Sequence, residues 1–588
     1  MLKCDGLKNL MFSLSMGSII CTAEFYHNPG VELMYNLNVV GVDSISFGLR
    51  RRALPEESIR VFEPVFIRQS PGNEATLIDT GNGIIKIFYI NRPRTADKMM
   101  SIASHDNGIT WNYPEMEFSL PGEAYYANNL VKGINGELHC VFHIWGKGDN
   151  GYNGRHLDLY YCRNESNGDG WTKPKKIYDG YVGSIRGFIH LINNRLLLAF
   201  ARAVPSRNQK PAGNVQDFGW NEIISMYSDD LGETWFSSEN GINIPVESTQ
   251  VTRYGGVEPE IIELNDKRVW MLIRTNKGSL YESFSENYGI TWLPPRPTHF
   301  FSSDSPADLL RLSDGRIVIL WSGNQRWDDD RSYANGGREV LHAAISSDDG
   351  VSWKGYREVL ISPSGHFVIK RDIGTAYPSA IETNEGKVLF VSGQAEERAV
   401  VMFDPDWLQK TSARDNFKEG LVQWTLFGAD TATGISPLPS GEKGSALLIT
   451  KSVSNRNHDT EVIWNFPMSQ KGILVINVLR NRGSKGINIA LTDHFSVSYD
   501  TLASEKGVFS FSAGSEKDAE KTKNLRIRIK WDCLTGKALA YIDNKLLCGL
   551  DFRRISVEGL NYLRMGIPGS EPDPMGYFIK SVKLIPLK

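Results

Sequence analysis

One short motif recurs along the chain and limits its possible folds more than any other feature. It reads Ser-x-Asp/Asn-x-Gly-x-Thr/Ser-Trp. Its four clear copies are SHDNGITW (104–111), SDDLGETW (228–235), SENYGITW (285–292) and SSDDGVSW (346–353). Ser and Asp side chains bond the local backbone, Gly accepts positive φ and Trp returns to an apolar layer, so the motif predicts a β-hairpin turn with a structural role. The last three copies are about 60 residues apart, as in a repeat architecture. A degenerate copy at 164–171 keeps Gly170 and Trp171.

A second repeat consists of a turn followed by an apolar strand. Its six copies are DTGNGIIKIFY (79–89), GINGELHCVFH (133–143), INNRLLLAFAR (192–202), LNDKRVWMLIR (264–274), LSDGRIVILWS (312–322) and TNEGKVLFVSG (383–393). Six such strands predict six four-stranded blades around an axis, which is a β-propeller. We expect residues 36–67 to supply the strand that closes the ring.

The pattern changes after about residue 409. Strand-like stretches continue without the eight-residue motif, namely SALLIT (445–450), GILVINVL (472–479), NLRIRIKW (524–531) and KALAYIDNKLL (537–547). Alternating strands and Gly-rich turns predict a jelly-roll, concanavalin-like β-sandwich. The predicted fold is therefore all-β, with an N-terminal segment (1–35), a six-bladed β-propeller (36–408) and a β-sandwich (409–588). The sandwich either binds carbohydrate or braces the propeller, and the sequence favours bracing because it shows no aromatic cluster there.

Composition excludes several classes of function. A formal net charge of -3 gives no electrostatic reason to expect nucleic acid or an acidic membrane as partner. The six Cys lack the spacing of metal ligands. Cys140 and Cys162 are expected to be buried thiols, with a disulfide between them as the alternative.

The N-terminus resembles a secretory leader. Lys3 and Lys8 precede the largely apolar stretch LMFSLSMGSIICTA (10–23), with a possible cleavage site after Ala23. No apolar run is long enough to span a bilayer. These features predict a protein that is exported to the periplasm, the cell surface or the medium.

Equivalent positions of propeller blades face the same place, so aligning the strand copies predicts a site. One ring of positions holds Asn73, Ala127, Arg186, Glu258, Pro306 and Tyr377, and a second holds Tyr89, His143, Arg202, Arg274, Ser322 and Gly393. Charged and phenolic side chains are unusual at strand ends that normally carry apolar residues, and several together indicate a site.

Three segments, VEPEIIELNDKRVWMLIR, GREVLHAAISSDDGVSW and GTAYPSAIETNEGKVLFV, carry a resemblance to a known family. Together with the eight-residue motif, an Asp box, they resemble the sialidase (neuraminidase) superfamily of BNR-repeat propellers, and bacterial glycoside hydrolase family 33 in particular. The resemblance implies that Tyr377 is a nucleophile, that Glu258 is its partner, and that Arg274 and Arg338 bind the substrate carboxylate. It places the acid/base at Asp97, in NRPRTADK.

The chain departs from this family in its first blade. The family begins that blade with Arg-Ile-Pro, whereas the aligned residues are Asn73-Glu74-Ala75. We expect Arg186 to substitute for the missing guanidinium from across the mouth, with Arg202, His143 and Asn73 as further substrate contacts. The expected substrate is sialic acid or a related sugar acid.

The resemblance implies a retaining exo-glycoside hydrolase that releases a terminal acidic sugar from a glycan. A neutral Tyr is a suitable nucleophile beside a substrate carboxylate, because an anionic nucleophile would be repelled. This mechanism requires no metal ion and no organic cofactor. Two alternatives remain open from the residues: a polysaccharide lyase that uses a Tyr or His143 to abstract a proton, and a non-catalytic glycan-binding propeller.

Overall fold

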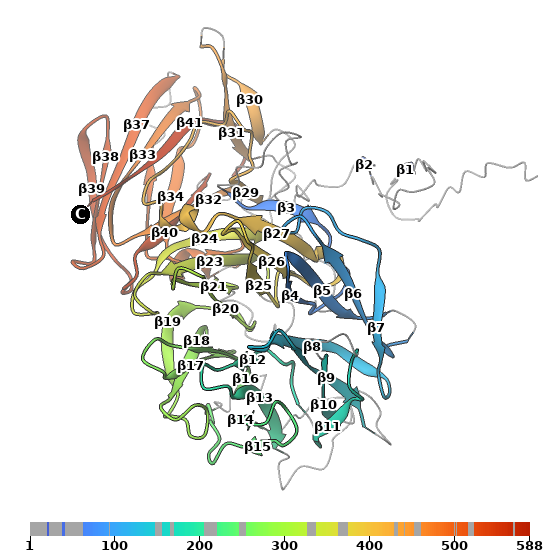
Figure 1. Cartoon of the computed structure of the whole chain (residues 1–588). Coiled ribbons are helices and arrows are strands. Elements are labelled where there is room, and N and C mark those ends of the chain that lie inside the picture. Colours follow the sequence, from blue (N-terminus) through green and yellow to red (C-terminus); the bar gives the residue numbers. More distant parts are fainter. Residues whose placement is uncertain are drawn as a thin grey trace, which may run out of the picture.

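The structure is a computed structural model that describes residues 20–22, 38–40, 63–92, 95–146, 156–164, 170–180, 182–204, 220–245, 255–325, 337–362, 374–427, 433–439, 442–451, 460–498, 500, 502–514, 522–567 and 571–587. Strands make up most of it, beside short helical turns such as α1 (Ala503–Lys506) and η3 (Pro405–Gln409). The predicted all-β class is therefore confirmed (Figure 1).

Six four-stranded antiparallel sheets, numbered here in chain order, form the first part of the molecule. They are sheet 1, β4 (Thr76–Gly81), β5 (Ile84–Ile90), β6 (Lys98–Ser104) and β7 (Glu115–Ser119); sheet 2, β8 (Ala124–Lys132), β9 (Leu138–Trp145), β10 (Leu157–Asn164) and β11 (Lys175–Tyr178); sheet 3, β12 (Gly187–His190), β13 (Leu196–Val204), β14 (Trp220–Ser228) and β15 (Phe236–Ser237); sheet 4, β16 (Gly256–Glu263), β17 (Val269–Thr275), β18 (Ser279–Ser285) and β19 (Arg296–Phe301); sheet 5, β20 (Asp308–Arg311), β21 (Ile317–Trp321), β23 (Val340–Ser346) and β24 (Lys354–Ile361); and sheet 6, β25 (Ser379–Glu382), β26 (Val388–Ser392), β27 (Ala399–Phe403) and β3 (Val65–Arg68).

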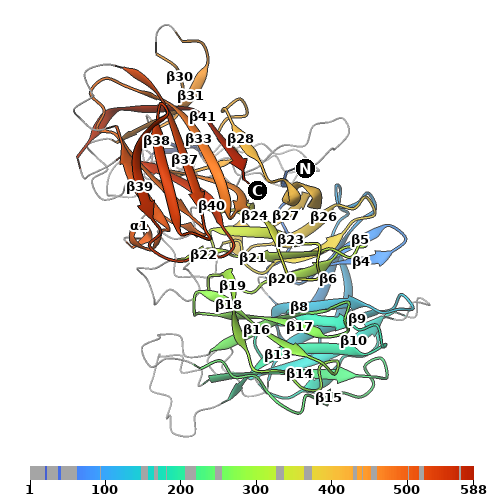
Figure 2. The ribbon, with the colours of Figure 1, turned by 90° about the vertical axis from the view of Figure 1, so that its left-hand side faces the viewer.

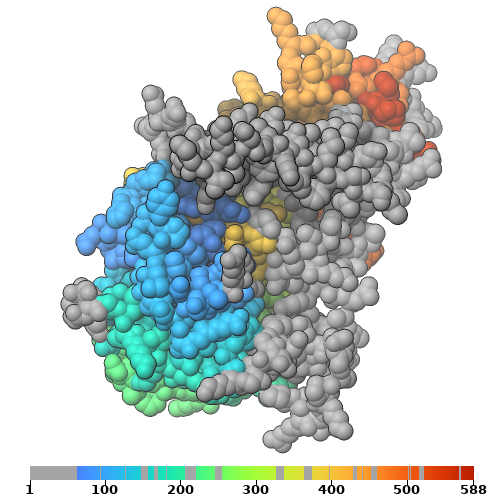
Figure 3. Space-filling model, turned by 90° about the vertical axis from the view of Figure 1, so that its right-hand side faces the viewer, coloured from blue at the N-terminus to red at the C-terminus, as the bar shows by residue number. Residues whose placement is uncertain are grey.

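The first strands of these sheets form a closed circuit. β4 contacts β8, and contacts continue through β12, β16, β20 and β25 back to β4. Figure 3 shows the outer parts of sheets 1, 2 and 3 following one another along one face. Of residues 36–67, which we expected to supply a closing strand, Val65 and Phe66 of β3 pair with Met402 and Val401 of β27, so a strand that precedes sheet 1 in the chain completes sheet 6. The apolar repeats of the sequence are the second strands of the sheets.

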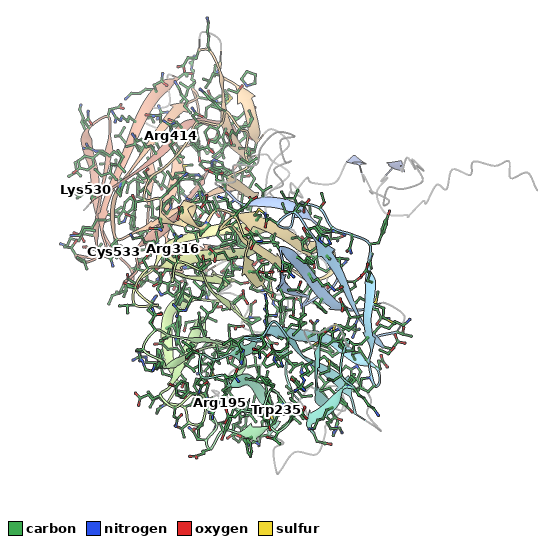
Figure 4. The ribbon with its side chains drawn as sticks, in the orientation of Figure 1. Arg195, Trp235, Arg316, Arg414, Lys530 and Cys533 are labelled. Atoms are coloured by element: carbon green, nitrogen blue, oxygen red, sulfur yellow. The ribbon has the colours of Figure 1, made fainter. Side chains whose placement is uncertain are left out.

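The eight-residue motifs form turns between the third and fourth strands, and each ties its sheet to the preceding one. In sheet 3, Asp230 accepts hydrogen bonds from Ser228 Oγ (2.8 Å) and from the Thr234 amide (2.8 Å), while Trp235 Nε1 donates to the Gly232 carbonyl (3.1 Å). Gly232 has a φ of 89°, and a Cβ there would lie 2.1 Å from the Tyr161 ring of sheet 2. Figure 4 places Trp235 at the outer margin of the ring.

Two further antiparallel sheets form the C-terminal part. The larger contains β30 (Gly434–Pro437), β31 (Ser445–Lys451), β41 (Asp573–Pro586), β33 (Lys471–Arg480), β37 (Lys523–Asp532), β38 (Lys537–Ile542) and β39 (Lys545–Asp551), with β28 (Ala413–Asp415) beside β41; the smaller contains β29 (Trp424–Phe427), β32 (Glu461–Ser469), β40 (Leu560–Gly566), β34 (Ile487–Thr492) and β36 (Phe509–Ala513). Their buried faces share one apolar core, to which Trp464, Ile476, Trp531 and Leu563 belong. This C-terminal sandwich lies beside sheets 5 and 6 (Figures 1 and 2), whereas its jelly-roll topology stays a prediction.

The structure also describes the two central cysteines, the helices and part of the proposed leader. Cys140 and Cys162 face each other on β9 and β10 as buried, free thiols. No helix among the described residues is long and apolar enough to cross a membrane. The proposed leader lies outside the described residues except for β1 (Ile20–Thr22), which pairs with β2 (Asn38–Val40).

Candidate functional site

Three residues with unusual backbone conformations lie near the beginnings of the first strands of sheets 1, 4 and 6. Glu74, Glu258 and Tyr377 have φ values of 46°, 48° and 64°. Each lies two residues before its strand begins regular pairing, and each is buried. Side chains other than Gly rarely adopt this left-handed conformation, and such residues concentrate at functional sites. The equivalent positions of these three sheets therefore form one candidate site.

Tyr377, Glu258 and Arg274 form a hydrogen-bonded triangle. The Tyr377 hydroxyl donates to Glu258 Oε1 (3.1 Å) and accepts from Arg274 Nη1 (3.0 Å). The same Arg274 nitrogen lies 2.5 Å from Glu258 Oε2. Residues far apart in the sequence thus meet at the centre of the ring, with a phenol, a carboxylate and a guanidinium in mutual contact.

A second guanidinium, that of Arg338, lies over the ring of Tyr377. Its Cζ is 5.4 Å from the ring centroid. Arg338 Nη1 donates to Gln394 Oε1 (2.8 Å) and Nη2 donates to the Asp304 carbonyl (3.1 Å). The Asp304 carboxylate accepts from Arg274 Nε (2.7 Å), so Asp304 connects the two guanidinium groups.

The surroundings hold Tyr377 in its neutral form. Burial raises the pKa of the Tyr377 phenol well above its ordinary value, and the charge of Glu258 raises it further. Glu74 acts in the same direction, while Arg274 and Arg338 oppose it. A proton therefore leaves this phenol only when a base accepts it during reaction with an electrophile.

Arg186 reaches across the ring from sheet 3 to sheet 6. Its Nη2 donates to the carbonyl of Pro378, the residue after Tyr377, and lies 4.0 Å from Asp308 Oδ1. Burial raises the pKa of Asp308 to about 7, and burial together with Asp308 raises the pKa of Glu260 well above its ordinary value. Arg186 is thus bound to the protein next to Tyr377, with the partly buried carboxyl group of Asp308 beside it.

Asp97 lies in the loop between β5 and β6, at the end of sheet 1 where its first strand begins. Its carboxylate accepts from Asn91 Nδ2 (3.0 Å), and this hydrogen bond is the main reason that the pKa of Asp97 is below its ordinary value. A general acid needs a raised pKa, so this resting environment does not favour the predicted role.

Three other predicted contacts have different surroundings. Arg202 Nε donates to Glu222 on the neighbouring strand (2.8 Å), and Asn73 Oδ1 accepts from the Ala395 amide (3.1 Å). His143 is fully buried, and neither ring nitrogen has a hydrogen-bond partner among the described residues. Burial lowers the pKa of His143 to about 3, so its imidazole is neutral.

Sequence alignment missed Glu74 because it misplaced sheet 1 by one residue. The apolar run of β5 starts at Ile84, which pairs with Gly81, and a register shift separates this pair from the regular pairing that begins with Asp79 and Ile85. Regular pairing places Glu74, not Asn73, at the inward position. The signal available in the sequence was an acidic residue two positions before Thr76.

Sheet 3 shows the same kind of displacement. The hydrogen bond that closes its turn starts at the Leu191 amide, so the apolar Ile192, which is 77% exposed, is part of the turn. Because Gly187 pairs with Ala199, Arg186 and Arg202 are each one residue away from the aligned positions, although the Arg186 side chain still reaches Pro378. Asp304, which precedes β20, was not identified because it lies in an irregular segment.

One group among the described residues has the composition of a metal site, at the edge of sheet 2. His156, Asp158 and Asp179 place their ligand atoms within 4.8 Å of one another. The Lys176 ammonium lies 2.6 Å from Asp158 and 3.0 Å from Asp179, so a cation already neutralises these carboxylates.

Comparisons with known proteins give a match to one family model and several structural likenesses. The model of a family described as BNR repeat-like domain matches residues 134–390. Trypanosoma rangeli sialidase in complex with sialic acid is 14% identical, with 93% of this chain and 96% of that chain covered and a TM-score of 0.40. A protein of unknown function from Dyadobacter fermentans is 18% identical, with 58% and 97% covered and a TM-score of 0.41. The comparison with curated protein sequences gave no match.

Proposed function

We propose that this chain, which matches the model of a BNR repeat-like domain family over residues 134–390, is a retaining exo-glycoside hydrolase that releases a terminal sugar acid from a glycan. The observation that carries the proposal is the contact of Tyr377 with both Glu258 and Arg274. The six sheets would be the blades of a six-bladed propeller (36–408), followed by the sandwich (409–588).

In the proposed first step, the Tyr377 oxygen attacks the anomeric carbon while its proton passes to Glu258 Oε1, 3.1 Å away. The bond from this carbon to the leaving oxygen breaks, and an acid protonates that oxygen. Because the phenol is neutral before attack, it approaches a substrate carboxylate without repulsion. Arg274 offsets the negative charge that Glu258 otherwise brings to the site.

The substrate carboxylate would lie against Arg274 and Arg338, since guanidinium groups bind carboxylates through charge-assisted, often bidentate hydrogen bonds. Glu74 stands on the sheet that supplies an Arg in the sialidases. A carboxylate at this point accepts hydrogen bonds, so we expect it to face a hydroxyl or amide N–H of the sugar.

In the second step, water would attack the anomeric carbon and displace the Tyr377 oxygen. Asp97 would first protonate the leaving oxygen and then, as a carboxylate, accept a proton from water, while Glu258 returns its proton to Tyr377. Asp97 meets this role only when the bound glycan separates it from Asn91, because that hydrogen bond favours the charged form. We further propose an exported protein, from the leader-like sequence of residues 1–23.

The test is an assay of the full chain on sialyl and uronyl fluorogenic glycosides, with the anomeric configuration of the product followed by NMR. We expect Tyr377→Phe to lower kcat by about 100-fold or more, because the nucleophile is lost. Tyr161→Phe is the matched control, since Tyr161 is a buried tyrosine that donates to the Leu231 carbonyl (2.8 Å). Full activity of Tyr377→Phe would remove this residue from the mechanism, and a product that absorbs in the ultraviolet would indicate a lyase.

A further inference from the structure

A two-residue strand at the end of sheet 5 joins the ring to the sandwich. β22 (Asn324–Gln325) pairs in parallel with β35 (Phe495–Ser496), which belongs to the C-terminal part of the chain. The Phe495 amide also donates to the Gly323 carbonyl (3.2 Å). Figure 2 shows β22 between the sandwich and sheets 4 and 5.

The first side chain of β22 holds the backbone next to Arg338. Asn324 is 1% exposed, and its Nδ2 donates to the carbonyl of Gly337. Gly337 has a φ of 77°, and a Cβ at this residue would lie 2.7 Å from the Cβ of Ser303. The chain just before Arg338 is therefore fixed by a hydrogen bond on one side and by close packing on another.

The second side chain of β22 holds the segment that carries Asp304. Gln325 Nε2 donates to the carbonyls of Gly278 (2.8 Å) and Ser302 (3.0 Å). Ser302 lies two residues before Asp304, whose carbonyl accepts from Arg338 and whose carboxylate accepts from Arg274. The two side chains of β22 thus reach both segments that set the guanidinium groups around Tyr377.

The sandwich fixes β35 in turn. The ring of Phe495 lies 6.1 Å from that of Phe427 and 5.9 Å from that of Tyr562, and these residues share an apolar cluster with Val340 of sheet 5. Val340 follows Arg338 by two residues. A displacement of β35 therefore reaches Arg338 by two routes, through β22 and through this cluster.

We infer that the C-terminal sandwich contributes to substrate binding at the site. Asn324 is the positioning residue through which the sandwich fixes the position of the Arg338 guanidinium. The inference rests on the proposed function, because it takes Arg338 as the group that binds the substrate carboxylate. It assigns the sandwich a role in substrate affinity even though none of its residues is placed in contact with the sugar.

The test compares two amides that each donate to a backbone carbonyl at the boundary between ring and sandwich. Asn324→Ala removes the bond to Gly337, whereas Asn561→Ala removes a bond to the Tyr356 carbonyl (3.0 Å), away from Arg338. We expect both variants to lower Tm, but only Asn324→Ala to raise KM for the glycoside, by about fivefold or more with a smaller change in kcat. Equal KM values in the two variants would overturn the inference.

Two further measurements apply if the Asn324→Ala variant does not fold or if the wild-type chain has no activity. If Asn324→Ala does not fold, Gln325→Ala takes its place, with the same expected increase in KM. If the wild-type chain hydrolyses no glycoside, the proposed function has failed, and the coupling is read from hydrogen exchange of residues 337–346. Faster exchange in Asn324→Ala than in Asn561→Ala supports the structural link, and equal exchange refutes it.

Discussion

Asp308 is a carboxyl group that the fold keeps protonated until nearly neutral pH. Burial raises its pKa from 3.8 to about 7, although Arg186 lies 4.0 Å away. The folded state therefore binds this proton more tightly than the unfolded state. The corresponding stability is fully present below pH 3.8 and is lost as the pH rises to about 7. A difference of this size equals roughly 4 kcal/mol as an upper limit.

Asp308→Asn keeps the shape of the side chain and removes its ionisation. We expect the Tm of the wild type to fall between pH 4 and pH 8 by more than that of Asp308→Asn, so that the variant is relatively more stable at the alkaline end. Asp406→Asn is the control, because Asp406 is an exposed partner of Arg316. Thermal unfolding at several pH values measures the difference. Parallel Tm curves for the wild type and Asp308→Asn would contradict the expectation.

At the scale of single elements, the Asp-box turn of sheet 3 allows us to test whether the motif contributes to stability and not to activity. Asp230 accepts from Ser228, Thr234 N–H and Thr234 Oγ1. In the equivalent turn of sheet 4, Asn287 Oδ1 accepts from Ser285 and from the Thr291 amide, and Asn287 Nδ2 donates to Thr291 Oγ1. We expect Asp230→Ala to lower the free energy of unfolding by about 1–2 kcal/mol, because amides of the turn lose their acceptor. Asp230→Asn should cost much less, since Asn287 already makes this turn.

Both variants should leave kcat and KM unchanged, because the turn lies between the third and fourth strands, away from Tyr377. Thermal unfolding and the glycoside assay measure the two effects separately. A change in KM for Asp230→Ala, or equal losses of stability for the two variants, would show that the motif acts in some other way.

The elements were predictable from sequence where local chemistry decides them, and the register was not. The turn motif and the six apolar strands predicted the hairpins correctly, because the Gly, Asp and Trp of the motif fix the turn through contacts within a few residues. The inward positions depend on pairing between strands, which apolar character alone does not fix. A register shift near Ile84 and the position of the apolar Ile192 in a turn each displace the alignment by one residue. Glu74 was therefore missed, and Arg202 was placed at the centre although it pairs with Glu222. Asp304 acts from an irregular segment that has no periodicity to detect.

At the scale of the whole molecule, ring and sandwich share buried polar contacts as well as apolar ones. The Gly323 amide donates to His342 Nδ1 (3.1 Å), so Nε2 carries the proton that goes to the Tyr562 hydroxyl (2.6 Å). Tyr562 then donates to Glu358 Oε1 (2.9 Å). Burial lowers the pKa of His342 to about 3, so its imidazole stays neutral over the physiological pH range. An interface of this kind predicts that the two parts unfold together.

Tyr562→Phe tests this cooperation, because it removes the hydroxyl that joins His342 of the ring to the sandwich while keeping the apolar ring in place. The buried His342 donor and the Glu358 acceptor both lose a partner, which costs about 2 kcal/mol. We expect one calorimetric transition for the wild type and two separated transitions for Tyr562→Phe. Tyr577→Phe is the control, since its hydroxyl donates to the Gly566 carbonyl (3.1 Å) inside the sandwich. If Tyr577→Phe separates the transitions equally well, general loss of sandwich stability is the cause, and the chain through Tyr562 does not couple the two parts.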